Sequence, residues 1–152
     1  MKLNLGVQKK IASNWFRFLQ SEIYKEFSAL EGKKSKDKIF KKKVWKKSEL
    51  KNEGGGTYVI MKGGDVFDSV GINFSEVSGR FKNKFRSQIL GAVESPNYWA
   101  SGISVVAHMK NPHIPAMHFN TRFIVTSKNW FGGGMDATPA IKDDKEKKIY
   151  HR

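Results

Sequence analysis

Residues 98–108 read Tyr-Trp-Ala-Ser-Gly-Ile-Ser-Val-Val-Ala-His, and residues 117–126 read Met-His-Phe-Asn-Thr-Arg-Phe-Ile-Val-Thr. Both runs have the apolar composition of β-strands, and the second alternates between apolar and polar residues. The linker between them contains Pro112 and Pro115, which exclude a regular helix there. Strands that follow one another without a long intervening helix predict an antiparallel sheet.

An amphipathic helix is predicted before these strands, over residues 11–30. Its apolar residues recur every four positions, at Ile11, Trp15, Leu19, Ile23 and Phe27, with Phe16, Phe18 and Leu30 widening the stripe. Gly32 is a suitable stop. We expect this aromatic stripe to belong to the core.

The remaining segments predict a mostly extended chain. Residues 33–51 form a lysine-rich connector, residues 54–56 a glycine break, and Gly63-Gly64 a hairpin turn. Strands are expected from Tyr58, over residues 66–77, and from Trp130 into Gly132-Gly-Gly134, while residues 79–95 suit a loop or short helix and residues 142–152 have helical propensity. The predicted fold is α+β: a large, flat antiparallel sheet flanked by helices, in a single domain over residues 1–152.

The composition is that of a globular protein, with 39% hydrophobic and 12% aromatic residues. There is no cysteine, which excludes disulfides and thiolate metal ligands. No apolar run approaches the roughly 18 residues that span a bilayer. The first residues, Met-Lys-Leu-Asn-Leu, lack the apolar core of a signal peptide. We therefore expect a cytoplasmic protein without a membrane span.

The net charge of +14 suggests an anionic partner. Only five of the 28 basic residues are arginine, whereas recognition of bases and phosphates favours the arginine fork. A lysine-rich surface without a nucleic-acid partner is thus the preferred interpretation. A basic nucleic-acid module stays open as an alternative, because Phe40 and Trp45 lie among lysines.

A cluster of polar residues interrupts the apolar strands. His118, Asn120 and Arg122 occupy alternate positions, so they share one face and can converge on one ligand. Arg122 suits a bidentate carboxylate, although a structural salt bridge explains it equally well. Ser104 and His108 also share a face with each other. Such clusters more often mark a site than a requirement of the fold.

Seven ordered motifs resemble the oxygen-dependent coproporphyrinogen III oxidase family. They are Gly54-Gly-Gly, Val66-Phe67, Gly71-Ile-Asn-Phe-Ser75, Ser101-Gly-Ile-Ser104, Asn111-Pro-His-Ile-Pro115, His118-Phe-Asn-Thr-Arg122 and Trp130-Phe-Gly-Gly-Gly-Met-Asp136-Ala-Thr-Pro139. The resemblance runs from the first helix to the last residue. It covers only the N-terminal half of the family pattern, so the chain looks like a truncated or split member.

The resemblance implies oxidative decarboxylation of two propionates of coproporphyrinogen III to vinyls, giving protoporphyrinogen IX in haem biosynthesis, with dioxygen as co-substrate. It implies that His118 is the proton donor and that Asp136 lies against the tetrapyrrole. It also implies that Ser104, Asn120, Thr121 and Arg122 bind substrate. Some members bind a divalent metal at positions matching His108, His118 and His151, but the chemistry requires no cofactor. Full-length members are expected to be homodimers. The alternative is an inactive fragment that still binds tetrapyrroles.

Overall fold

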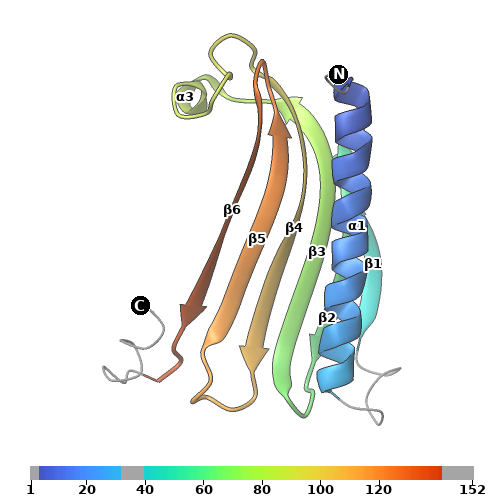
Figure 1. Ribbon diagram of the computed structural model, residues 1–152, viewed down its shortest axis with the longest axis vertical. Helices are drawn as coiled ribbons and strands as arrows, with labels where there is room; N and C mark the ends of the chain where they lie inside the picture. Colours follow the sequence, from blue (N-terminus) through green and yellow to red (C-terminus); the bar gives the residue numbers. More distant parts are fainter. Residues whose placement is uncertain (1–3, 32–39, 142–152) are drawn as a thin grey trace.

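The computed structural model describes residues 4–31 and 40–141, which form a six-stranded sheet with one long helix against it (Figure 1). The elements are α1 (Leu5–Leu30), β1 (Lys41–Lys46), β2 (Gly54–Lys62), β3 (Phe67–Arg80), α3 (Asn83–Arg86), β4 (Asn97–Met109), β5 (Ala116–Val125) and β6 (Asn129–Thr138). Each strand pairs antiparallel with the next, in the order β1-β2-β3-β4-β5-β6. The α+β prediction is confirmed.

The helix α1 begins earlier than its apolar pattern predicts, because the Asn4 side chain caps it by accepting a hydrogen bond of 2.7 Å from the backbone N–H of Gly6. Its buried side centres on Ala12 and Phe16, and the Phe16 side chain is only 1% exposed. These two residues join the apolar side chains of β2, β3, β4 and β5 in one core cluster. The side-chain N–H of Gln20 also donates to the backbone oxygens of Thr57 (2.8 Å) and Ile72 (2.9 Å). Packing and hydrogen bonding thus both fix the helix on the sheet.

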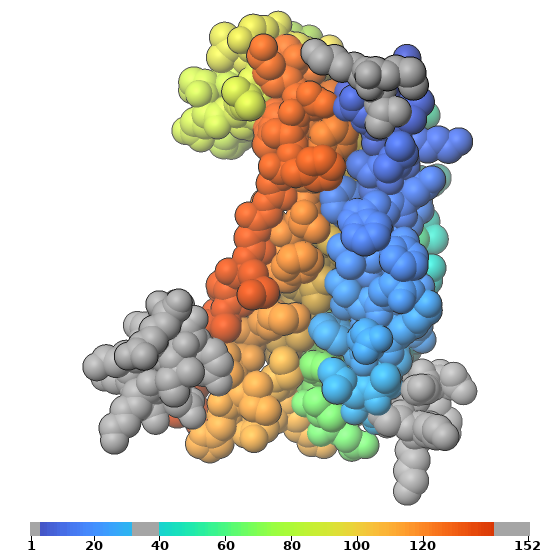
Figure 2. Space-filling view, in the orientation of Figure 1, coloured from blue at the N-terminus to red at the C-terminus, as the bar shows by residue number. Residues whose placement is uncertain are grey.

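The prediction that the whole aromatic stripe of α1 is core is wrong for one side of the stripe. Ile11, Trp15 and Phe18 are 54%, 53% and 52% exposed. Leu30, at the end of the helix, is exposed as well. The stripe is wider than the line along which a straight helix touches a sheet. The sheet therefore buries the Ala12–Phe16 side, while Ile11 and Trp15 line a pocket with side chains of β5 and β6. Figure 2 shows the blue helix beside the orange strands at the surface.

Two predicted irregular segments prove to be strands. β1 lies inside the lysine-rich connector, where Val44 is largely exposed and Trp45 donates a 3.0 Å hydrogen bond to the Asn73 side chain. The glycine break at residues 54–56 is the start of β2. A Cβ at Gly55 or Gly56 would collide with backbone of the neighbouring strands, so these glycines permit the pairing.

The other predicted elements are confirmed. Gly63 and Gly64 form the turn between β2 and β3, and Gly63 has a positive φ of 69°. The short helix α3 falls within residues 79–95, and β4 and β5 match the two strands that define the fold. The strand β6 continues without interruption through its three glycines. Gly32 and the predicted helical tail at residues 142–152 lie outside the described residues.

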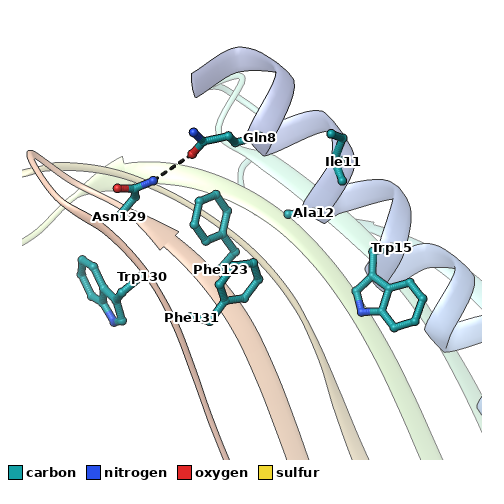
Figure 3. A pocket seen from close by; sticks show the side chains of 8 residues that line it. All are labelled: Gln8, Ile11, Ala12, Trp15, Phe123, Asn129, Trp130 and Phe131. Carbon is teal, nitrogen blue, oxygen red and sulfur yellow. Dashed lines mark hydrogen bonds between the residues drawn. The ribbon is translucent and has the colours of Figure 1, made fainter. Parts of the chain in front are cut away.

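An apolar groove of about 380 Å³ lies between α1 and the strands β5 and β6 (Figure 3). Ile11 and Trp15 line it from the helix, and Phe123, Trp130 and Phe131 from β5 and β6. A 2.9 Å hydrogen bond from the side chain of Asn129 to that of Gln8 closes one end. Phe131 is 66% exposed, and Met135 further along β6 is 75% exposed. Large apolar side chains are therefore exposed on this face of the sheet.

We expect the purified chain to self-associate through this groove despite its positive charge. The double substitution Trp15→Gln and Phe131→Thr should shift it toward monomer without lowering its melting temperature, because both side chains are already exposed. Sedimentation velocity over a concentration series measures the change. Lys25→Ala, on an exposed part of the same helix, is the matched control. A wild-type chain that stays monomeric at every concentration contradicts this expectation.

Candidate functional site

The sheet has one apolar face and one polar face. Ile103, Val105 and Ala107 of β4 and Phe123 of β5 are buried on the side that α1 covers. Because side chains alternate along a strand, the even-numbered residues of β4 and β5 point to the opposite side. The predicted site residues Ser104, His108, His118, Asn120 and Arg122 all fall on that opposite face.

Strand register places these residues in neighbouring rows. Ser104 of β4 lies opposite Asn120 of β5, and Asn120 lies opposite Gly134 of β6. His118 lies opposite Asp136. Directly opposite residues share a face and lie in side-chain contact range. The sheet therefore brings together residues that are up to 32 positions apart in the sequence.

Arg122 reaches along its own strand rather than to an acidic partner. Its Nη2 donates to Oδ1 of Asn120 at 2.7 Å. Within residues 4–31 and 40–141, no carboxylate lies within ion-pair distance of its guanidinium. The structural salt bridge left open by the sequence is thus not present among these residues. A guanidinium has five N–H donors, so the exposed Arg122 retains donors for an anionic ligand.

A hollow of about 260 Å³ lies beside Arg122. Its lining residues come from β3, β4 and β5: Ser75, Gly102, Ile103, Ser104, Asn120, Thr121 and Arg122. Ser75 and Gly102 were not singled out as site residues from the sequence. Both lie within motifs that carry the family resemblance, and this membership could have identified them from the sequence.

His118 and Asp136 form a close pair at the same face. His118 Nδ1 lies 3.2 Å from Asp136 Oδ1, but the two lack the alignment of a hydrogen bond. The Nδ1 atom is shielded from solvent and has no hydrogen-bond partner among the described residues. The other carboxylate oxygen, Oδ2, accepts a 3.0 Å hydrogen bond from the Thr138 hydroxyl. The strand register, rather than a hydrogen bond between them, therefore holds His118 and Asp136 next to each other.

His108 lies near His118, with ring centroids 6.1 Å apart and planes at 87°. Two of the three predicted metal ligands therefore share one region of the polar face. The third, His151, lies outside the described residues. Among residues 4–31 and 40–141, no three His, Asp or Glu side chains are placed to hold a metal ion. The metal site stays a prediction that depends on His151.

Thr121 differs from the other predicted substrate-binding residues. It lies opposite Ile103 and Gly133, in the odd-numbered row that faces away from His118 and Arg122. Contact between Thr121 and a ligand on the polar face therefore involves its backbone rather than its hydroxyl group.

None of the helices in the described part of the chain combines the length and the apolar character that a membrane crossing requires. The polar face thus presents the guanidinium of Arg122, the imidazoles of His108 and His118, and the carboxylate of Asp136. The family model described as coproporphyrinogen III oxidase matches residues 11–152.

Curated relatives give the same result. An oxygen-dependent coproporphyrinogen-III oxidase of Rickettsia typhi is 49% identical over 145 residues, covering 94% of this chain and 52% of the relative. The enzyme of the same name from Rickettsia prowazekii is also 49% identical, with the same coverage. That of Rickettsia bellii is 45% identical over 145 residues, again covering 94% and 52%. The chain belongs to the coproporphyrinogen III oxidase family, and it spans about half the length of the curated relatives it matches.

Proposed function

We propose that this chain forms one wall of a coproporphyrinogen III-binding cleft in an oxygen-dependent coproporphyrinogen oxidase. The observation that carries the proposal is the open row of His118, Asn120 and Arg122 with Asp136 alongside. The names of the relatives support the substrate. The position of five lysines in and beside the edge strand β1 argues against a nucleic-acid partner, since lysines commonly protect such edges.

The proposed reaction removes carbon dioxide and a hydride equivalent from each propionate, leaving a vinyl group. Dioxygen accepts the hydride equivalent and, with one proton, gives hydrogen peroxide, so atoms and electrons balance. In this proposal Arg122 binds a propionate that is not reacting, and Asn120 and Ser104 orient the macrocycle. Asp136 accepts hydrogen bonds from pyrrole N–H groups, and His118 donates the proton.

The proposal requires no organic cofactor, because the electron-rich pyrrole can itself be oxidised by dioxygen. A divalent metal, if bound, would be held by His108 and His118 together with His151. It would supply Lewis-acid chemistry. No role given to the other residues depends on it.

The cleft is proposed to be incomplete in this chain. The substrate carries four carboxylates, whereas the row on β5 offers one guanidinium. The rest of the family's length is proposed to supply the opposite wall and to complete a homodimer, in a cytoplasmic enzyme. A half-cleft cannot exclude water or hold a reacting geometry, so we expect the chain alone to bind tetrapyrrole weakly without converting it.

The proposal predicts that Arg122→Ala weakens tetrapyrrole binding by at least about tenfold, the loss of a charge-assisted bidentate contact. An anaerobic titration with coproporphyrinogen III, repeated with coproporphyrin III and followed by fluorescence, measures the affinity. Arg122→Lys should restore only part of it, because an ammonium lacks the planar fork. Binding should also weaken as salt is raised.

Lys25→Ala is the matched control, since it removes an exposed cation from α1, on the other side of the sheet. It should leave the affinity unchanged. Binding by Arg122→Ala at the wild-type affinity, or no binding by the wild-type chain, contradicts the proposed function.

A further inference from the structure

Residues 81–96 connect β3 to β4 and form a compact loop at one end of the sheet (Figure 1). The backbone N–H of Phe81 donates to the Pro96 oxygen at 2.8 Å, so the two ends of this β3–β4 loop meet. Hydroxyl groups in the β5–β6 turn donate hydrogen bonds of 2.8 and 3.0 Å to the backbone oxygens of Leu90 and Gly91. The backbone of the loop is therefore held in a defined shape.

Three large apolar side chains of the β3–β4 loop nevertheless lie on its outside. Ala92 is 0% exposed, whereas Leu90 and Val93, on either side of it, are 59% and 69% exposed. Phe85, in the short helix α3, is 44% exposed. The loop thus buries a small residue and leaves these larger ones in contact with solvent. Exposed apolar side chains that are gathered in one segment indicate an interaction surface.

The same part of the chain has an excess of positive charge. Four cations occupy alternate positions from the last residue of β3 into α3: Arg80, Lys82, Lys84 and Arg86. Glu94 is the only acidic residue between positions 80 and 96. Within residues 4–31 and 40–141, no carboxylate lies within ion-pair distance of any of the four cations. Their charge is therefore available to an anionic partner.

The chemistry of the exposed side chains distinguishes between anionic partners. A single nucleic-acid strand would use the cations, but its bases stack on aromatic rings, and Leu90 and Val93 are aliphatic. An anionic lipid surface suits both kinds of side chain. Its headgroups attract lysine and arginine, and the boundary between headgroups and acyl chains accepts apolar side chains. Charge and apolar exposure together thus favour a lipid surface.

We propose that the β3–β4 loop docks the protein on an anionic lipid surface. The side chains of Phe85, Leu90 and Val93 enter the boundary between headgroups and acyl chains, and the four cations lie against the headgroups. The attachment is peripheral, through a loop, and involves no membrane-spanning segment. It goes beyond the proposed function, because it concerns where the protein is held and not which substrate it binds.

The test measures how the purified chain partitions onto sedimenting vesicles of phosphatidylcholine, prepared with and without phosphatidylglycerol. We expect binding to the mixed vesicles, little binding to the neutral ones, and weaker binding as salt is raised. Lys82→Gln/Lys84→Gln should weaken partitioning about 25-fold, since each lysine near an anionic surface contributes about fivefold. Leu90→Ser/Val93→Ser keeps the charge and should weaken partitioning by at least about tenfold.

Two matched controls separate the loop from other surfaces. Lys42→Gln/Lys43→Gln removes two exposed lysines from the edge strand β1 and should partition nearly as the wild type. Trp15→Gln/Phe131→Thr alters the apolar groove beside α1 and should also partition as the wild type. Thermal melts should be unchanged in the loop variants, because the substituted side chains are exposed. If one loop pair fails to fold, the other tests the proposal by itself.

Other results would overturn the proposal. Equal binding to neutral and mixed vesicles excludes recognition of anionic lipid, and an equal loss in the β1 lysine pair makes the binding a diffuse effect of charge. Wild-type partitioning of Leu90→Ser/Val93→Ser excludes insertion of the loop. If the lysine pair weakens binding to duplex DNA but not to vesicles, the loop is a nucleic-acid surface. If fusion to the C-terminal half of the Rickettsia typhi relative abolishes vesicle binding, the rest of the protein covers the loop.

Discussion

Replacing His118 by alanine should reduce turnover by a factor of about 10²–10⁴ in a completed enzyme, the usual contribution of a positioned proton-transfer group. The imidazole lies on the open face with Asp136 Oδ1 3.2 Å from its Nδ1, and the nearby His108 ring is centred 6.1 Å away. A suitable enzyme is this chain fused to the remaining C-terminal half of the Rickettsia typhi relative. Vinyl formation under oxygen measures the rate.

The accompanying affinity separates proton transfer from binding. His118→Ala should lower kcat with little change in the affinity for coproporphyrinogen, whereas Arg122→Ala should lower both. His113→Ala is the control, because His113 lies in the exposed linker between β4 and β5. A wild-type rate in the His118→Ala enzyme would contradict the assignment of His118 as the proton donor.

Replacing Glu31 by alanine should destabilise the fold strongly. Glu31 caps the end of α1, is only 5% exposed, and receives three backbone N–H groups from the β2–β3 connection. Asp65 donates at 2.7 Å, Val66 at 3.2 Å and Phe67 at 2.6 Å. The Phe67 N–H is buried, and leaving it without a partner costs about 1–3 kcal/mol, whereas the donors of Asp65 and Val66 are only partly buried and lose less. We therefore expect the free energy of unfolding to fall by about 2 kcal/mol or more.

Urea denaturation of the monomeric Trp15→Gln/Phe131→Thr background measures this loss. Glu22→Ala is the matched control, since Glu22 forms only an exposed ion pair with Lys25 on the same helix and should matter by less than about 1 kcal/mol. Glu31→Gln should lie between the two, because its amide retains one acceptor oxygen. Equal stability of the Glu31 and Glu22 alanine variants would show that the connection does not depend on this carboxylate.

Local alternation was enough to predict the strands that carry the site. The polar positions of β5 are two residues apart, so their common face followed from the sequence alone. The position of Asp136 beside His118 did not, because it depends on the register of β6 against β5. The family resemblance had already implied that Asp136 and His118 belong to one site.

The wrong predictions concern β1, the start of β2 and the buried side of α1, and each depends on contacts between segments that are distant in the sequence. β1 was missed because an exposed edge strand contains lysines in place of an apolar pattern, and Val44 is 78% exposed there. The glycines of β2 look like a break unless the neighbouring backbone is known. The whole apolar stripe of α1 was predicted to be buried because aromatic residues widen it on both sides of Phe16. Only contact with the sheet decides which side is buried.

The central claim is that the chain provides one binding wall and that turnover needs the other half of the family's length. The most direct measurement is an oxygenated assay for vinyl formation, run side by side on the purified 152-residue chain and on its fusion to the C-terminal half of the Rickettsia typhi relative. The account predicts turnover by the fusion and none by the chain alone, although the chain binds coproporphyrinogen under anaerobic conditions. Robust vinyl formation by the chain alone would contradict it and would make this half the complete catalytic unit.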